Sequence, residues 1–187
     1  CTIRLLNSDA LTFIEDCSQN PDYREVIKKI GDEKIRKKED QELVLRFFAL
    51  KNDIEHYKFP VAEYLTNYLE GITTQEKPFD YIKEKEIFDK TFKIINLNLG
   101  DSAFSSITKA KNIKNDFVTY LFDGISIAIA NLVDRIAVDK KNVKIEEKVY
   151  DIKIGSELQS YKTGTMSSLN KRIELFKEGV ENVIDER

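Results

Sequence analysis

The residue types that could form a specific polar site are concentrated in one short string. Arg36, Asp40, Glu42 and Arg46 are interleaved there with apolar side chains. Glu42 and Arg46 lie four residues apart with the acid first, which is the favourable order for an ion pair on one helix. Alternatively, Arg46, which stands between two apolar neighbours, points inward and ties its helix to another part of the molecule. The sequence leaves both interpretations open.

Groups typical of catalysis or metal binding are sparse. His56 is the single histidine, and no second histidine or cysteine pair lies at ligand spacing, so we predict no zinc site. Cys17 follows two acidic residues, a setting that raises the pKa of a thiol. The adjacent carboxylates Glu146 and Glu147 would not face each other on a helix. No P-loop, GxSxG or GxGxxG string is present. We therefore predict no catalytic residue and no metal in this chain.

Lysines form local basic groups in an otherwise acidic chain. The formal net charge of −3 provides no global attraction to nucleic acid, so DNA binding would need a basic face. Candidate contacts to a DNA backbone are Lys109, Lys111, Lys114, Lys162 and Lys171, joined by Arg172. The first three lie in the least apolar segment, for which a solvated loop is the alternative interpretation.

The elements that must position these residues surround one apolar run, from Phe117 to Val138. Apolar residues recur there at helical spacing and small residues fill most of the other side, which predicts a helix buried on nearly all sides. Asp123, Asp134 and Arg135 interrupt the run well before the length of about 18 apolar residues that a membrane span needs. We therefore expect a central core helix.

The remaining segments predict amphipathic helices around this centre. Residues 79–100 form a long one that ends at a glycine, and the last helix starts at Thr165 or Ser167. Residues 139–156 fit either a strand or a weak helix, and the context favours helix. The sum is about seven or eight helices in one all-α domain that spans residues 1–187.

Composition limits the setting. Only 7 glycines and 3 prolines leave little turn chemistry for a β fold. Two cysteines are too few for a disulfide framework, and we expect a reduced, cytoplasmic location without a membrane. The chain begins at Cys1 without an initiator methionine, from which we expect it to be a piece of a longer polypeptide.

Four stretches together resemble a known family. They are IRKKEDQELVLRFFAL with VAEYLTNYLEG, then FDKTFKIINLNLGDSAF, YLFDGISIAIA and TGTMSSLNKRIEL. In this order they resemble the C-terminal helical half of a large bacterial family catalogued only as a domain of unknown function. The N-terminal half of that family has a ParB/sulfiredoxin-related fold with an Asp-Gly-Gln-Gln-Arg motif. Its members include modification-dependent restriction endonucleases of the GmrSD kind and other phage-defence proteins.

The resemblance implies a helical support for a nucleotide-dependent DNA-cleaving protein. Its Asp-Gly-Gln-Gln-Arg segment and its frequent His-Asn-His nuclease domain are absent here, so no catalytic residue carries over. The implied cofactors, an NTP and a divalent metal, belong to the full-length protein. We expect the missing N-terminal domain as partner, with dimer contacts in addition. The expected partner-facing or substrate-facing residues are Arg36, Asp40, Glu42, Arg46, Thr163, Gly164 and Arg172, and for each an intradomain network is the alternative.

Two other classes of function remain beside this hypothesis. A helical DNA-binding or protein-interaction module would use the lysines named above and would bind DNA in a salt-sensitive manner. A stand-alone helical scaffold would need no partner, and a native reading frame that starts at Cys1 would favour it.

Overall fold

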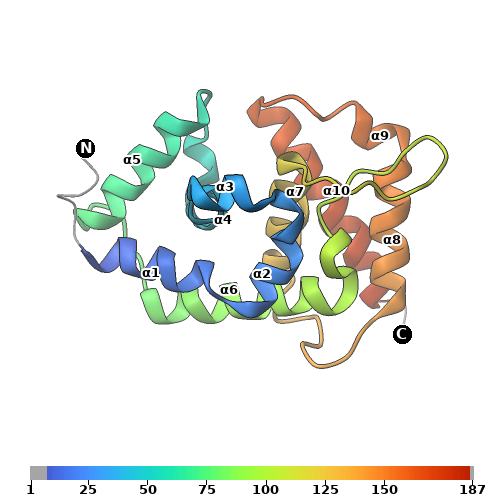
Figure 1. Cartoon of the computed structure of the whole chain (residues 1–187), viewed down its shortest axis with the longest axis horizontal. Coiled ribbons are helices and arrows are strands. Elements are labelled where there is room, and N and C mark those ends of the chain that lie inside the picture. The colour runs from blue at the N-terminus through green and yellow to red at the C-terminus, as the bar shows by residue number, and fades with distance from the viewer. Residues whose placement is uncertain (1–7, 186–187) are drawn as a thin grey trace.

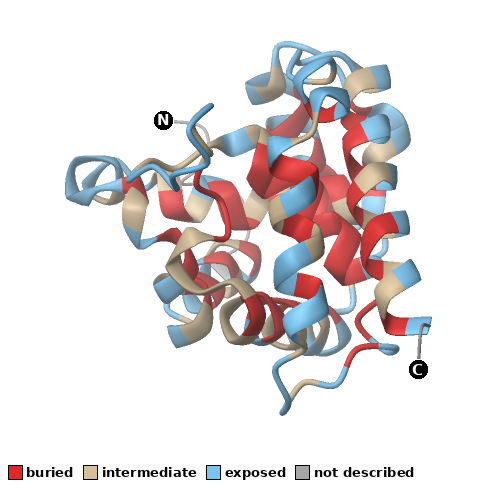
Figure 2. Ribbon diagram, turned by 90° about the vertical axis from the view of Figure 1, so that its right-hand side faces the viewer, coloured by how far each residue is buried: buried red, intermediate tan, exposed pale blue. Residues whose placement is uncertain are grey.

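Helix α7 (Thr119–Asn131) is enclosed by the rest of the molecule. In the computed structural model, which describes residues 8–185, every residue of this helix from Leu121 to Ala130 is buried. It packs against three long helices, namely α4 (Glu39–Asp53), α6 (Tyr81–Leu99) and α10 (Met166–Asp185). Figure 2 shows that buried residues gather where these helices meet, with exposed residues on the outer turns and loops. The prediction of a buried central helix is confirmed.

The other helices form two groups joined by α6, which runs along the lower edge of the molecule in Figure 1. The first group, around α4, comprises α1 (Ser8–Ser18), α2 (Pro21–Ile27), α3 (Asp32–Arg36) and α5 (Val61–Thr73). The second group, around α10, comprises α8 (Val143–Ile154) and α9 (Ser156–Gln159). Helix α7 lies between the groups, so a polar contact made by α7 can join them.

Residues 8–185 contain ten α-helices and no β-strand, which confirms the all-α class and exceeds the expected number of seven or eight. Only an isolated bridge pairs Ile107 with Ile113 in the loop before α7. The ambiguous segment 139–156 contains α8, in agreement with the helix that context favoured. None of the described helices has the length and apolar character needed to cross a membrane. Cys1 lies outside the described residues.

The central helix is shorter than predicted. The expected element covered residues 117–138, whereas α7 ends at Asn131 and the chain continues in turns. Leu132 and Ile136 remain buried, but Asp134 and Arg135 between them are exposed. Apolar spacing alone therefore overestimated the helix, because the turns bury the apolar residues while they place the charged ones in solvent.

Aromatic side chains hold α4 against α2 and α6. The ring of Phe47 lies edge-on to that of Phe88 at 5.4 Å between centroids, and Phe88 lies 4.5 Å from Phe92. Tyr23 of α2 meets Phe92 edge-on at 4.9 Å. Such pairs contribute about 0.5–1.5 kcal/mol each beyond the burial of their area. Because Arg46 directly precedes Phe47, this cluster fixes the position from which Arg46 reaches α7.

Candidate functional site

A buried ion pair with two hydrogen bonds joins α4 to α7. Nε and Nη2 of Arg46 donate to the two carboxylate oxygens of Asp123 at 2.5 and 2.7 Å. The two side chains are only 12% and 2% exposed. Burial lowers the pKa of Arg46, but the hydrogen bonds and charge of Asp123 outweigh it and the pKa is raised. The Arg46 guanidinium therefore stays charged in a region that excludes most water.

This pairing decides between the two interpretations of Arg46. Among the described residues Arg46 forms its ion pair with Asp123, and the Glu42–Arg46 pair on one helix is not formed. Glu42 is exposed, although its charge still favours the charged form of Arg46. The interpretation of an inward-pointing Arg46 is confirmed, and that of a pair on one helix is wrong.

Helix α10 approaches α7 at the residue that follows Asp123. A Cβ atom placed on Gly124 would lie 3.0 Å from a ring carbon of Phe176 and 3.5 Å from Cβ of Arg172. Only glycine leaves room for so close an approach. The consequence is that Arg172 enters the same interior region as the Arg46–Asp123 pair.

Arg172 is almost fully buried, with 2% of its surface exposed. Its Nη1 donates to the backbone carbonyls of Tyr161 and Thr163, the latter at 2.9 Å. Its guanidinium carbon lies 5.9 Å from the ring centre of Tyr120. Burial lowers the pKa of Arg172, and the charge of Arg46 adds to this effect, while Asp123 opposes it. Nε of Arg172 has no hydrogen-bond partner among the described residues.

The loop that Arg172 holds also contacts the first helical group. The Tyr57 hydroxyl donates to the carbonyl of Gly164 at 3.1 Å. Phe59, whose side chain is 78% exposed, lies over Gly164, 3.7 Å from where a Cβ atom would stand. Oγ1 of Thr163 is 2.6 Å from Oγ of Ser168, a hydroxyl pair at the surface. Segments far apart in the chain thus meet across α7.

Two of the predicted residues lie elsewhere. Arg36 is exposed at the end of α3. Asp40 is buried at the start of α4, where its carboxylate is 3.0 Å from Nη1 of Arg24 and its backbone carbonyl accepts from the Tyr23 hydroxyl at 2.6 Å. The string of interleaved charges is therefore divided, because helical geometry directs Asp40 to α2 and Arg46 to α7. Glu42 stays near Arg46, and both line a surface hollow of about 200 Å³.

The lysines proposed for DNA form two separate groups. Lys109, Lys111 and Lys114 are exposed in the loop before α7, where the Lys111 carbonyl accepts from the hydroxyl of Tyr150 on α8. Lys162 and Lys171 lie near α10's first turns, 5.6 and 5.2 Å from the ring centres of Tyr120 and Tyr161. Figure 1 shows the loop projecting at the right, whereas the start of α10 lies at the top.

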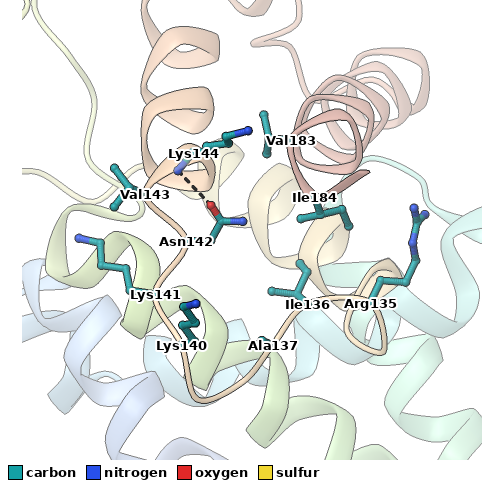
Figure 3. A pocket seen from close by; sticks show the side chains of 10 residues that line it. All are labelled: Arg135, Ile136, Ala137, Lys140, Lys141, Asn142, Val143, Lys144, Val183 and Ile184. Carbon is teal, nitrogen blue, oxygen red and sulfur yellow. Dashed lines mark hydrogen bonds between the residues drawn. The ribbon is translucent and has the colours of Figure 1, made fainter. Parts of the chain in front are cut away.

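A hollow of about 570 Å³ lies between the start of α8 and the end of α10 (Figure 3). Its lining includes Lys140, Lys141 and Lys144 together with Val183 and Ile184. None of the residues predicted from the sequence lines it. The side-chain oxygen of Asn142 accepts from the backbone N–H of Lys144 and so caps α8 (Figure 3).

One cluster has the ligand types of a metal site. Ligand atoms of Asp53, Glu55 and His56 lie within 4.8 Å of one another. One oxygen of Asp53 already contacts Nδ1 of His56 at 2.7 Å and accepts from Nζ of Lys77 at 2.8 Å. A positive charge supplied by Lys77 occupies the position a cation would use, so the cluster is explained as an ion-pair network. The absence of a metal remains a prediction.

Sequence reasoning missed the partners of the two arginines. Asp123 was noted only as an interruption of the apolar run, yet a carboxylate inside a buried helix requires a partner and was the available signal. Tyr57 and Tyr120 carried no comparable signal. No protein-family model, curated protein or solved structure matches the chain.

Proposed function

We propose that this chain is the non-catalytic helical region of a nucleotide-dependent DNA restriction or phage-defence protein. In this proposal it supports a ParB-like half that carries the NTP, the divalent metal and the catalytic groups. The proposal rests on the sequence resemblance and on one structural observation that makes the resembling stretches a single unit.

That observation is the convergence of the four stretches on α7. They contribute α4, α5, α6, α7 and α10, and α7 packs directly on α4, α6 and α10. The first stretch supplies Arg46, the third supplies Asp123, and the last supplies Arg172. Residues 46 and 123 are joined by two charge-assisted hydrogen bonds, which fix geometry as well as energy. This supports the view that the resembling residues form one rigid body.

The structure narrows the residues that can face a partner. Asp40, Arg46 and Arg172 serve contacts within the domain, so their role toward a partner is indirect. Arg36, Glu42, Thr163 and Gly164 are exposed and remain candidates for direct contact. Beside Gly164, the exposed ring of Phe59 adds an apolar group of the kind that anchors interfaces.

The first test is the reading frame directly upstream of Cys1. The proposal expects it to encode Asp-Gly-Gln-Gln-Arg within a ParB-like domain, and a frame without that segment contradicts it. If the segment is present, the upstream half and this chain should be produced separately and mixed. NTP hydrolysis and DNA cleavage should then require the upstream half, and binding between the halves should appear in titration calorimetry.

Variants of this chain sharpen the test. Phe59→Ser and Arg36→Gln should weaken binding of the upstream half without changing the thermal midpoint of the isolated chain. Lys83→Gln changes an exposed residue of α6 that is not among these candidates, and it serves as the control. Turnover of nucleotide or DNA by the purified chain alone, at a constant ratio to its concentration, would defeat the proposal.

The alternative is a DNA-binding or protein-interaction module. Exposed Lys162 and Lys171 near the start of α10 favour the DNA-binding version. It predicts binding of a DNA duplex whose affinity falls steeply with salt, in proportion to the number of phosphates contacted. Fluorescence anisotropy at low salt tests it: Lys162→Gln with Lys171→Gln should weaken binding more than Lys83→Gln. Absence of binding at low salt removes this alternative.

A further inference from the structure

Lys153 is a buried amine that the proposed function does not use. It stands in the last turn of α8 and only 9% of its surface is exposed. Its Nζ donates one hydrogen bond, to the carbonyl of Ser102 at 2.9 Å. Among the described residues no carboxylate lies within ion-pair distance of it, although a buried ammonium ordinarily has one.

The charged groups that face Lys153 do not neutralise it. Lys29, from the turn after α2, lies on one side and donates to Oγ of Ser105 at 3.2 Å, while its own carboxylate partner is Asp101. Asp116, whose negative charge raises the pKa of Lys153, accepts from the backbone N–H and hydroxyl of Ser106. Burial lowers the pKa of Lys153 to about 7, and the positive charge of Lys29 adds to this effect. At neutral pH the Lys153 amine is therefore neutral far more often than that of an exposed lysine.

Lys153 lines a small cavity of about 60 Å³, together with Ser102, whose carbonyl accepts from its Nζ. Its walls are mostly apolar and come from the end of α6, the loop before α7 and α8. They include Leu99, Ile107, Ile113 and Val149, with Glu146 and Tyr150 also on the lining. Such a volume holds a molecule of only a few heavy atoms, since one water occupies about 30 Å³ of liquid. The cavity therefore favours small molecules.

We propose that Lys153 is a covalent reaction site for short aldehydes. A neutral lysine amine in an apolar pocket beside a second cation is the arrangement that activates lysine toward carbonyl carbon. The nitrogen lone pair forms a C–N bond while the C=O π pair moves to oxygen, and a proton passes from nitrogen to oxygen through water. Loss of one water molecule then gives the C=N bond of a Schiff base. Amine and aldehyde become imine and water, with no oxidation or reduction.

The test uses the whole chain with acetaldehyde and sodium cyanoborohydride, which reduces the imine to a stable ethyl-lysine. The rate at each lysine is measured by peptide mass spectrometry between pH 6 and 9. At pH 7 the neutral fraction of an ordinary lysine is smaller than that of Lys153 by a factor on the order of a thousand. After allowance for access and lower nucleophilicity, Lys153 should react at least about tenfold faster than exposed Lys83 at pH 7. This advantage should shrink toward pH 9. A Lys153 rate at or below that of Lys83 at pH 7 overturns the proposal.

Two further experiments test the role of the cavity and the role of the neighbouring charge separately. Benzaldehyde should fail to modify Lys153 while it still modifies exposed lysines, and equal reaction at Lys153 contradicts the role of the cavity. Lys29→Gln removes the neighbouring positive charge and should slow ethylation of Lys153 several-fold at pH 7, whereas Lys83→Gln should leave that rate unchanged. An unchanged rate in Lys29→Gln would contradict the role of the second cation. Circular dichroism of both variants checks that each remains folded.

Discussion

Arg46 and Arg135 each connect helical elements through carboxylates, the first inside the molecule and the second at its surface. Arg46 joins α4 to α7 through Asp123, and both side chains are nearly withdrawn from solvent. Arg135, in the turns after α7, reaches Glu181 and Asp185 on α10, and its side chain is 43% exposed. The chemical groups are the same, and the second arginine even has two acids. Their surroundings decide how much each contributes, because water screens and competes for the surface pair only.

Loss of one partner of the Arg46–Asp123 pair should cost more unfolding free energy than replacement of both partners by apolar residues. Removal of one partner leaves an uncompensated charge in the interior, whereas apolar residues of similar volume remove both desolvation penalties. The surface arginine leaves a charge that water can solvate. The charge left behind by each substitution, buried or solvated, should therefore decide how much unfolding free energy is lost.

The largest effect is expected for Asp123→Asn. This change keeps the shape of the side chain but leaves Arg46 charged and buried, and it should cost about 3–5 kcal/mol of unfolding free energy. Urea unfolding followed by circular dichroism measures it. Asp139→Asn, the same substitution in the exposed partner of Lys93, is the matched control and should leave the midpoint unchanged.

The double variant Arg46→Met with Asp123→Leu completes this test. It should be more stable than Asp123→Asn, since no buried charge remains. If Asp123→Asn unfolds at the urea concentration of the unmodified chain, or if the double variant is the least stable, the argument from burial is wrong.

Lys153 extends the comparison to a buried cation without a carboxylate. Its pKa of about 7 in the folded chain lies below the ordinary value of 10.5. Between these two pH values the unfolded chain binds more protons than the folded chain. The contribution of Lys153 to the unfolding free energy therefore rises with pH. The unfolding free energy of the unmodified chain should increase relative to Lys153→Met by up to about 1.4 kcal/mol per pH unit from pH 7 to 9.

The upper limit of pH 9 lies below the ordinary ionisation of tyrosine. Burial raises the pKa of Tyr64 and Tyr68, so their contributions fall as the unfolded chain ionises near pH 10. Both proteins share these tyrosines, and Lys83→Met provides a control that should run parallel to the unmodified chain. Parallel curves for Lys153→Met would show that Lys153 stays protonated in the fold.

A smaller effect is expected where α10 closes on the buried pair. Gly124→Ala places a methyl group 3.0 Å from the ring of Phe176, which is itself buried and cannot easily move. Overpacking of this kind costs about 1–3 kcal/mol. Gly164→Ala is the control, because its new methyl group would meet only Phe59 at an ordinary 3.7 Å. Thermal unfolding compares the two variants directly. Equal midpoints would mean that α7 and α10 move apart without loss of unfolding free energy.

The sequence predicted the elements better than the contacts between them. Apolar spacing placed the buried centre correctly, and the glycine after residue 99 marked the end of α6, which spans Tyr81–Leu99 against the predicted 79–100. Local periodicity and capping are short-range properties, so a single sequence contains them. The same periodicity extended α7 too far, because it does not distinguish a helix from turns that bury apolar residues.

The polar site could be predicted only in part. An inward Arg46 was one of two interpretations, but its partner lies 77 residues away and no local pattern connects them. Asp40 shows the same limit, since it contacts Arg24 on another helix. Long-range pairing depends on how helices pack, which spacing within one helix does not specify.

The smallest effect is expected for Arg135→Gln, and it tests the other side of the comparison. Glu181 and Asp185 lose their cation, but both lie at the surface, where water and salt replace it. The pKa of Arg135 is raised mainly by the hydrogen bonds that it donates to Asp185 and Glu181, and burial has little effect on it. The urea midpoint should change less than in Gly124→Ala, and the difference should vanish in 1 M salt, where the screening length falls to about 3 Å. A loss in Arg135→Gln as large as that in Asp123→Asn, and unaffected by salt, would mean that the number of acids matters more than their burial.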